Sequence, residues 1–222
     1  GLTYDLFWKE YKHKLSFYTS AQHVDRNSYY GAQQDPNAYG KTKDLTFVGG
    51  GMYVGNFDKV LFSPATFTAG LEYSHNNMHD IMAGYNRDLE QKVRIASAFF
   101  QNEWKMNDFT LLAGFRLDDH NLIENLIFSP RVNLLYKPSD ALQGRLTWST
   151  GFRAPQAYDE DLHVTAVGGE GVLIHLADGL KPEKSNSFSG SVDLSGQIGH
   201  FQTNLLIEGF YTSLKDVFYL QN

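Results

Sequence analysis

Between Ser185 and Ser195 every second residue of the sequence is small and polar. The polar positions are Ser185, Ser187, Ser189, Ser191, Asp193 and Ser195, and the residues between them include Phe188, Gly190, Val192 and Leu194. A period of two is typical of a β-strand with one polar and one apolar face. The segment is longer than the usual strand of about five or six residues. Roughly ten residues of a tilted strand cross the hydrocarbon core of a bilayer, so a membrane-spanning strand is one interpretation.

The same alternation recurs along most of the chain. In one clear case Leu146 and Trp148 lie on one face, and Arg145 and Thr147 lie on the other. Together the alternating segments predict about ten strands. They cover residues 3–10, 15–25, 45–57, 66–74, 93–105, 109–118, 128–137, 142–152, 185–195 and 201–212.

The connections between these strands alternate between short and long. Tight turns are expected near residues 12–14, 58–64, 107–108, 138–140 and 199–200, and longer links at residues 27–42, 77–91, 121–126 and 153–182. In an up-and-down meander all short turns then lie at one end. Outer-membrane barrels have this asymmetry, with short periplasmic turns and long extracellular loops.

A soluble β-sandwich or lipocalin-like barrel is the alternative, because such folds alternate as well. Charged residues such as Arg116, Arg145 and Glu72 fall in mid-strand on the polar face. They fit a water-filled lumen, but they fit the wet exterior of a soluble binding or adhesion module equally well. A requirement for detergent would separate the two alternatives.

Composition excludes several other classes. The sequence has no run of 18 apolar residues, so it predicts no transmembrane helix. The absence of cysteine excludes disulfides and thiolate metal sites. The net charge of -6 argues against a nucleic-acid partner. No nucleophile-elbow pattern is present, so we expect neither an enzyme nor a cofactor. No leader opens the chain, which we interpret as a removed export signal.

Several motifs resemble the barrel of TonB-dependent outer-membrane receptors. In that family one strand ends in Gly-Phe-Arg-Ala-Pro, a large extracellular loop follows, and the next strand begins with Leu-x-Pro-Glu-x-Ser. The segments at residues 114–121, 127–136 and 209–218 also resemble strands of the family. The matching motif residues are Gly151, Phe152, Arg153, Ala154 and Pro155, followed by Leu180, Pro182, Glu183 and Ser185.

The resemblance implies an all-β, antiparallel up-and-down meander that forms part of a 22-stranded transmembrane barrel. Residues 1–222 would be a partial barrel domain, lacking the plug and the C-terminal strands. The implied function is TonB-dependent uptake of a ferric siderophore, haem or cobalamin in the outer membrane of a Gram-negative bacterium. The implied partners are outer-membrane lipid, the plug, TonB through the plug, and the nutrient. We also expect an isolated fragment to self-associate through its strand edges.

Ligand contacts are expected in the long loops, because binding residues gather on loops above a rigid scaffold. Arg153 and Glu183 are instead expected to organise the strand ends beside the largest loop. His75 and His79 have the spacing of helical zinc ligands but lie where a strand passes into a loop, so no metal site is expected. The ligand-facing candidates are Tyr29, Tyr30, Met78, His79, Tyr85, Tyr158, Asp159, Asp161, His163 and His175.

Overall fold

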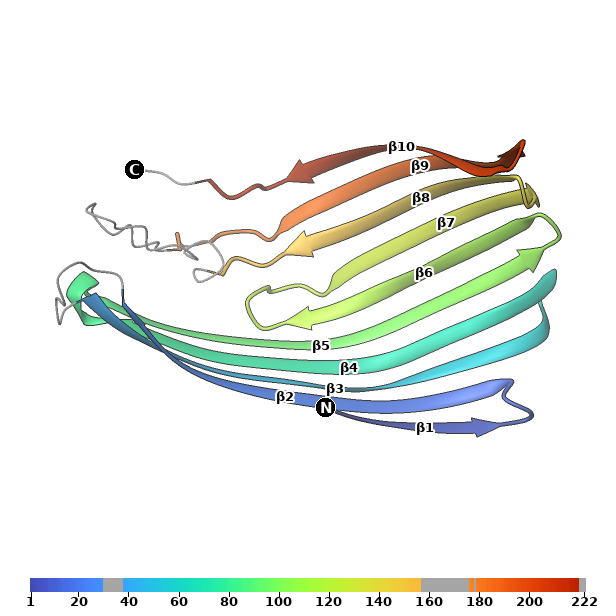
Figure 1. Ribbon diagram of the computed structural model, residues 1–222. Coiled ribbons are helices and arrows are strands. Elements are labelled where there is room, and N and C mark those ends of the chain that lie inside the picture. Colours follow the sequence, from blue (N-terminus) through green and yellow to red (C-terminus); the bar gives the residue numbers. More distant parts are fainter. Residues whose placement is uncertain (30–37, 157–175, 178, 220–222) are drawn as a thin grey trace.

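The computed structural model describes residues 1–29, 38–156, 176–177 and 179–219. Its strands form one antiparallel sheet whose spatial order equals the order in the chain (Figure 1). A single turn of 3₁₀ helix, η2 (Ala83–Tyr85), joins two of them. The strands are β1 (Leu2–Trp8), β2 (His13–Tyr29), β3 (Tyr39–Val60), β4 (Ser63–Met82), β5 (Arg87–Met106), β6 (Phe109–His120), β7 (Ile127–Ser139), β8 (Leu142–Arg153), β9 (Glu183–Ile198) and β10 (Phe201–Lys215). The predicted ten-stranded meander is confirmed.

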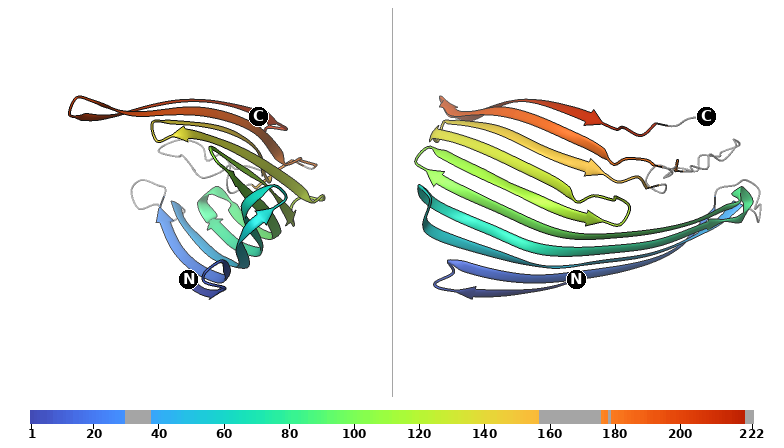
Figure 2. Two further views of the ribbon diagram at one scale, coloured as in Figure 1. Left: turned by 90° about the vertical axis from the view of Figure 1, so that its right-hand side faces the viewer. Right: turned by 180° about the vertical axis from the view of Figure 1, so that it is seen from behind.

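The sheet is curved about an axis along its strands, so that it has a concave inner and a convex outer face (Figure 2). Directly paired residues of antiparallel strands point to the same face. One such row joins Leu146, Gly190 and Gly209 across β8, β9 and β10, and the next residues along each strand point the other way. The registers therefore collect the apolar stripes of the sequence on the outer face and the serine ladder of β9 on the inner face.

An aromatic ladder crosses the outer face from β1 to β7. Neighbouring rings have centroids between 4.9 and 6.0 Å apart, a spacing at which aromatic pairs attract one another. No second layer of the described chain covers this face, and Leu146 is 63% exposed. Such a large exposed apolar surface requires a cover, and in an outer-membrane barrel lipid supplies it. The ladder consists of Trp8, His13, Tyr53, Phe67, Phe100, Phe115 and Phe128.

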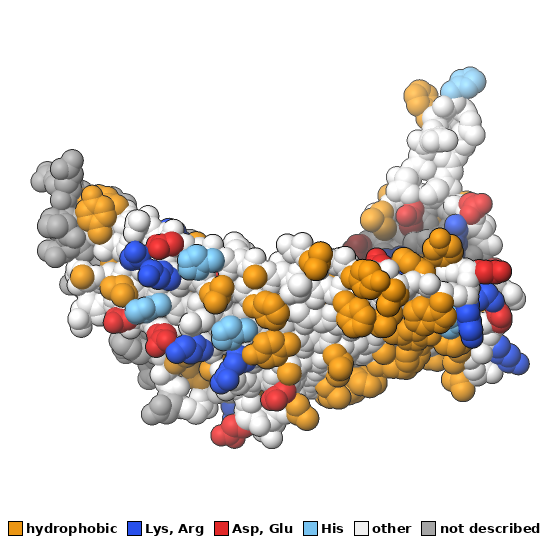
Figure 3. Space-filling view, turned by 90° about the horizontal axis from the view of Figure 1, so that it is seen from below, with side chains coloured by type: hydrophobic (Ala, Val, Ile, Leu, Met, Phe, Trp, Pro, Cys, Tyr) orange, Lys and Arg blue, Asp and Glu red, His pale blue; other side chains and the backbone are white. Residues whose placement is uncertain are grey.

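Beyond the apolar band, towards the long connections, the outer face becomes polar. Figure 3 shows hydrophobic side chains gathered over the middle of the sheet and towards the short turns, with charged side chains at the short-turn edge and charged and histidine side chains towards the other end. The pairings His79 with Glu90 and Asn77 with Lys92 belong to this polar region. In Figure 1, β2 to β5 extend beyond β6 to β8 at this end.

This extension corrects the expected long link at residues 77–91. Strand β4 continues to Met82 and β5 begins at Arg87, so most of those residues are paired strand. In a membrane barrel the outer face needs apolar side chains only within the bilayer, so a strand that continues beyond it has a polar sequence that resembles a loop. The first tight turn is also displaced. It lies at residues 9–12 rather than 12–14, with positive φ at Lys9, Glu10 and Tyr11. In the described part of the chain, no helix has the length and apolar character needed to span a membrane.

Candidate functional site

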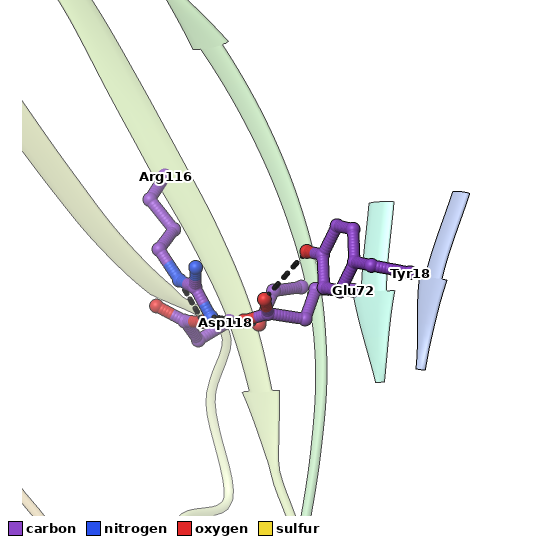
Figure 4. A network of polar contacts seen from close by, with 5 residues as sticks. Tyr18, Glu72, Arg116 and Asp118 are labelled. Atoms are coloured by element: carbon purple, nitrogen blue, oxygen red, sulfur yellow. Dashed lines mark hydrogen bonds and ion pairs between the residues drawn. The ribbon is translucent and has the colours of Figure 1, made fainter. Parts of the chain in front are cut away.

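A row of polar side chains lies across the inner face of the sheet. The registers align Tyr18, Gly50, Glu72, Ser97 and Asp118 across β2, β3, β4, β5 and β6. Gly50 leaves space for the Tyr18 side chain within this row, because a Cβ at position 50 would lie 2.6 Å from the Tyr18 hydroxyl oxygen. The missing side chain lets Tyr18 reach across β3, where its hydroxyl donates to Glu72 Oε2 at 2.6 Å (Figure 4).

Arg116 connects the two carboxylates of this row. Its Nη2 donates to Glu72 Oε1 at 3.0 Å and to Ser97 Oγ at 2.7 Å, and its Nε donates to Asp118 Oδ1 at 2.7 Å. Ser97 Oγ in turn donates to Asp118 Oδ1 at 2.6 Å. The Asp118 side chain is 3% exposed and that of Arg116 39%. The network therefore holds fixed charges on the concave face, with Asp118 buried and Arg116 partly exposed there.

A second inner-face cluster lies near the long connections. Thr42 Oγ1 accepts from Arg26 Nη2 at 3.0 Å and donates to Asp80 Oδ1 at 2.5 Å, and Arg87 Nε donates to Asp80 Oδ2 at 2.7 Å. The Arg87 and Asp80 side chains are 5% and 8% exposed. This buried ion pair crosses from β4 to β5 and holds together the hairpin that extends beyond the apolar band.

A third cluster joins the two sequence motifs on either side of the largest loop. Arg153 Nε donates to Glu183 Oε2 at 2.7 Å, and Glu183 Oε1 accepts from the backbone N–H of Phe218 at 2.6 Å. The Arg153 guanidinium lies 5.0 Å from the centroid of the Phe218 ring. One ion pair thus connects the end of β8, the start of β9 and the segment after β10. Ala154, the next residue of the motif, is 5% exposed.

The loop residues expected to face a ligand occupy different environments. The Tyr29 ring contacts the Tyr39 ring in a tilted arrangement with centroids 4.8 Å apart, and Tyr29 is 38% exposed. Met78 lies on the inner face but is only 3% exposed. His79 lies on the outer face, where Nε2 is 2.6 Å from Asp88 Oδ1. Tyr30, Tyr158, Asp159, Asp161, His163, His175 and the side chain of Tyr85 lie outside the described residues.

The structure does not bring the histidines together with further ligands. His75 and His79 share the outer face of β4, and Asp80 points to the inner face, where Arg87 holds it. Within the residues that the structure describes, no group of three or more His, Asp or Glu side chains could hold a metal ion.

Sequence reasoning did not single out Tyr18, Ser97 or Arg87. The two-residue alternation of the strands already indicates that Tyr18 and Ser97 belong to the polar face, and both lie on the inner face. Their partners are separated from them by 54 and 21 residues, and only the register brings them together.

The comparisons with known proteins agree with the geometry. The family described as TonB dependent receptor-like, beta-barrel matches residues 1–222. Among solved structures, the siderophore receptor PirA from Pseudomonas aeruginosa has 14% identity and a TM-score of 0.60 over 91% of this chain and 40% of that chain. PirA from Acinetobacter baumannii has 18% identity and a TM-score of 0.61, over 96% of this chain and 41% of that chain.

A third solved structure is the ferric enterobactin receptor PfeA from Pseudomonas aeruginosa, in complex with enterobactin. It has 20% identity and a TM-score of 0.58, over 86% of this chain and 32% of that chain. None of the curated proteins matches the chain in sequence. The chain spans about 40% of the length of the two PirA receptors. The family whose model matches consists of receptors and transporters in the Gram-negative outer membrane. The chain belongs to the TonB-dependent receptor β-barrel family.

Proposed function

We propose that this chain is part of the barrel of an outer-membrane receptor for TonB-dependent uptake of a nutrient chelate of the ferric siderophore, haem or cobalamin class. The polar inner face is the observation that carries the proposal. Its central row from Tyr18 to Asp118 keeps charged groups on the concave wall, while the aromatic ladder occupies the convex wall. Polar lumen and apolar exterior are what a transport barrel needs.

In this proposal the long connections recognise the ligand, and the strands hold these connections in position. Tyr29 is the described candidate that combines exposure with an aromatic surface. The long loop that carries Tyr158 and His163 begins and ends at the Arg153–Glu183 ion pair, so this pair fixes the positions of both loop ends. We assign Arg153 and Glu183 a positioning role rather than a ligand contact. The nutrient would be transported without chemical change, with energy supplied by TonB acting on the plug.

Uptake by the receptor that contains this chain tests the proposal. Cells lacking their own chelate receptors would be supplied with radiolabelled ferric enterobactin, ferric citrate, haem and cyanocobalamin in turn. We expect accumulation of one of them, lost when TonB is deleted. Failure of all four to accumulate, or uptake that persists without TonB, would overturn the proposal.

In the described sheet β1 and β10 each have a single neighbouring strand. We therefore still expect the isolated fragment to self-associate. Light scattering that found a clean monomer would contradict this expectation.

A further inference from the structure

The outer face of β8, β9 and β10 contains an amphiphilic track. Its rows, read from the long connections towards the short turns, change from cationic to polar, then aromatic, then open and apolar. In the first row Lys184 is paired directly with Lys215 on one side and with Phe152 on the other. The rows that follow are Thr150, Asn186 and Ser213; Trp148, Phe188 and Tyr211; Leu146, Gly190 and Gly209; and Gly144, Val192 and Ile207.

The cationic end of the track is electrostatically incomplete. Like charges directly opposite each other on a sheet are unfavourable, and neither lysine forms an ion pair within the described residues. The neighbouring acid, Glu183, points to the other face and is held by Arg153 and the Phe218 N–H. A cavity of about 960 Å³ adjoins the lysines, and its lining includes a third lysine, Lys181. Glu124 and Asp216 also line this cavity, and neither forms an ion pair in the described part of the chain.

The row below supplies polar groups without partners. Thr150 Oγ1 is buried and has no hydrogen-bond partner among the described residues. Trp148 Nε1 donates to Asn186 Oδ1 at 2.7 Å, and within the part of the chain that the structure describes the Asn186 amide N–H groups donate to no other side chain and can serve as donors towards the cavity. A Trp between an apolar and a polar zone is typical of the membrane interface.

The lower end of the track is an apolar furrow of about 550 Å³. Gly190 and Gly209 form part of its floor, and Leu146, Phe188 and Tyr211 are among the side chains that line it. A Cβ at Gly209 would meet no atom within 4 Å, so the space above this residue is open. From the lysine row to the glycine row the distance along the strands is roughly 20 Å. A molecule that uses both ends must therefore be long, anionic at one end and apolar at the other.

We infer that this track binds one lipid of the outer leaflet whose phosphate-bearing headgroup has a net negative charge, with the phosphate between Lys184 and Lys215 and an acyl chain in the furrow over Gly190 and Gly209. The inference rests on the proposed placement of the chain in the outer membrane. Lysines near a membrane surface attract anionic headgroups, and the furrow lies where the barrel exterior meets acyl chains. A free phosphate would use only the cationic end, whereas a zwitterionic lipid would gain little from the paired lysines.

Native mass spectrometry of the receptor barrel containing this chain tests the inference. The purified protein is titrated in detergent with dioleoylphosphatidylglycerol, dioleoylphosphatidylcholine or inorganic phosphate. We expect one tightly bound phosphatidylglycerol. The double variant Lys184→Ala/Lys215→Ala should weaken its binding by about tenfold or more. Gly209→Leu, which adds an apolar side chain where a Cβ would meet no atom within 4 Å, should weaken binding of the lipid but not of inorganic phosphate.

Matched variants control for charge and for glycine loss. Lys59→Ala/Lys137→Ala removes the same charge at the short-turn end, and Gly196→Leu adds the same side chain on the outer face of β9 away from the furrow, where the nearest atom to a new Cβ is 3.9 Å away. Both should retain the lipid. The inference is overturned if phosphatidylcholine binds equally well, if inorganic phosphate binds as tightly as the lipid, or if the control variants lose as much affinity as the test variants. Uptake of the nutrient chelate is a separate readout, so failure of either proposal leaves the other testable.

Discussion

Leu146→Arg should lower the free energy of unfolding of the barrel in phospholipid vesicles by about 2 to 4 kcal/mol, the cost of an arginine near the middle of the lipid face of a barrel. Leu146 is 63% exposed on the outer face of β8, four residues from the start of the strand. On the exposed surface of a water-soluble sheet the same change would cost about 0.5 kcal/mol or less. The measurement is urea-induced unfolding and refolding in vesicles.

Ser189→Arg is the matched control for this prediction. Ser189 lies on β9, the strand paired with β8, one residue out of phase with Gly190, and therefore points to the inner face. Its side chain forms no hydrogen bond within the described residues, so the new arginine would extend into the lumen at little cost. Equal losses for Leu146→Arg and Ser189→Arg would contradict the assignment of the two faces.

Arg116→Met should destabilise the folded barrel by about 2 to 3 kcal/mol. The change leaves the carboxylate of Asp118, 3% exposed, and that of Glu72 without their shared cation. Removing one partner of a fully buried ion pair costs about 3 to 5 kcal/mol. The expected loss is smaller here because Arg116 is 39% exposed. Urea unfolding of the barrel in detergent measures it.

Two further variants separate the charge effect from general loss of an inner-face side chain. Arg145→Met removes another inner-face arginine, which has no ion pair in the described part of the chain, and should change stability by about 0.5 kcal/mol or less. Asp118→Asn added to Arg116→Met should regain part of the loss, because it removes the unpaired buried charge. A double variant that is no more stable than Arg116→Met would refute the electrostatic explanation.

The alternation of side chains in the sequence predicts the strands and their two faces well only where lipid lies against the outer face. From Leu142 to Trp148 the outer positions of β8 are apolar or glycine, as lipid contact requires, so the period of two is visible. In the upper parts of β4 and β5 both faces are polar, as at His79 and Glu90. The period disappears there, and the sequence was mistaken for a loop.

The inner-face network could be predicted only in part. The charges at Glu72 and Arg116 were visible as polar mid-strand positions, and their common face followed from parity. That Tyr18 joins them depends on the register between β2, β3 and β4 and on the space above Gly50. These are long-range properties, and no pattern within a single strand contains them. Arg153 and Glu183 were expected to organise the strand ends beside the largest loop, but the ion pair between them was not predicted.

Spin-label accessibility along β8 tests the central claim, that the outer face of this sheet lies against lipid and the inner face against water. The chain contains no cysteine, so single cysteines can be placed one at a time at positions 142 to 148 of the receptor barrel in vesicles. Even-numbered positions should be more accessible to oxygen, which concentrates in lipid, and odd-numbered positions to a water-soluble nickel complex. Equal accessibility of both sets to the nickel complex would show that water covers both faces and would contradict the membrane barrel.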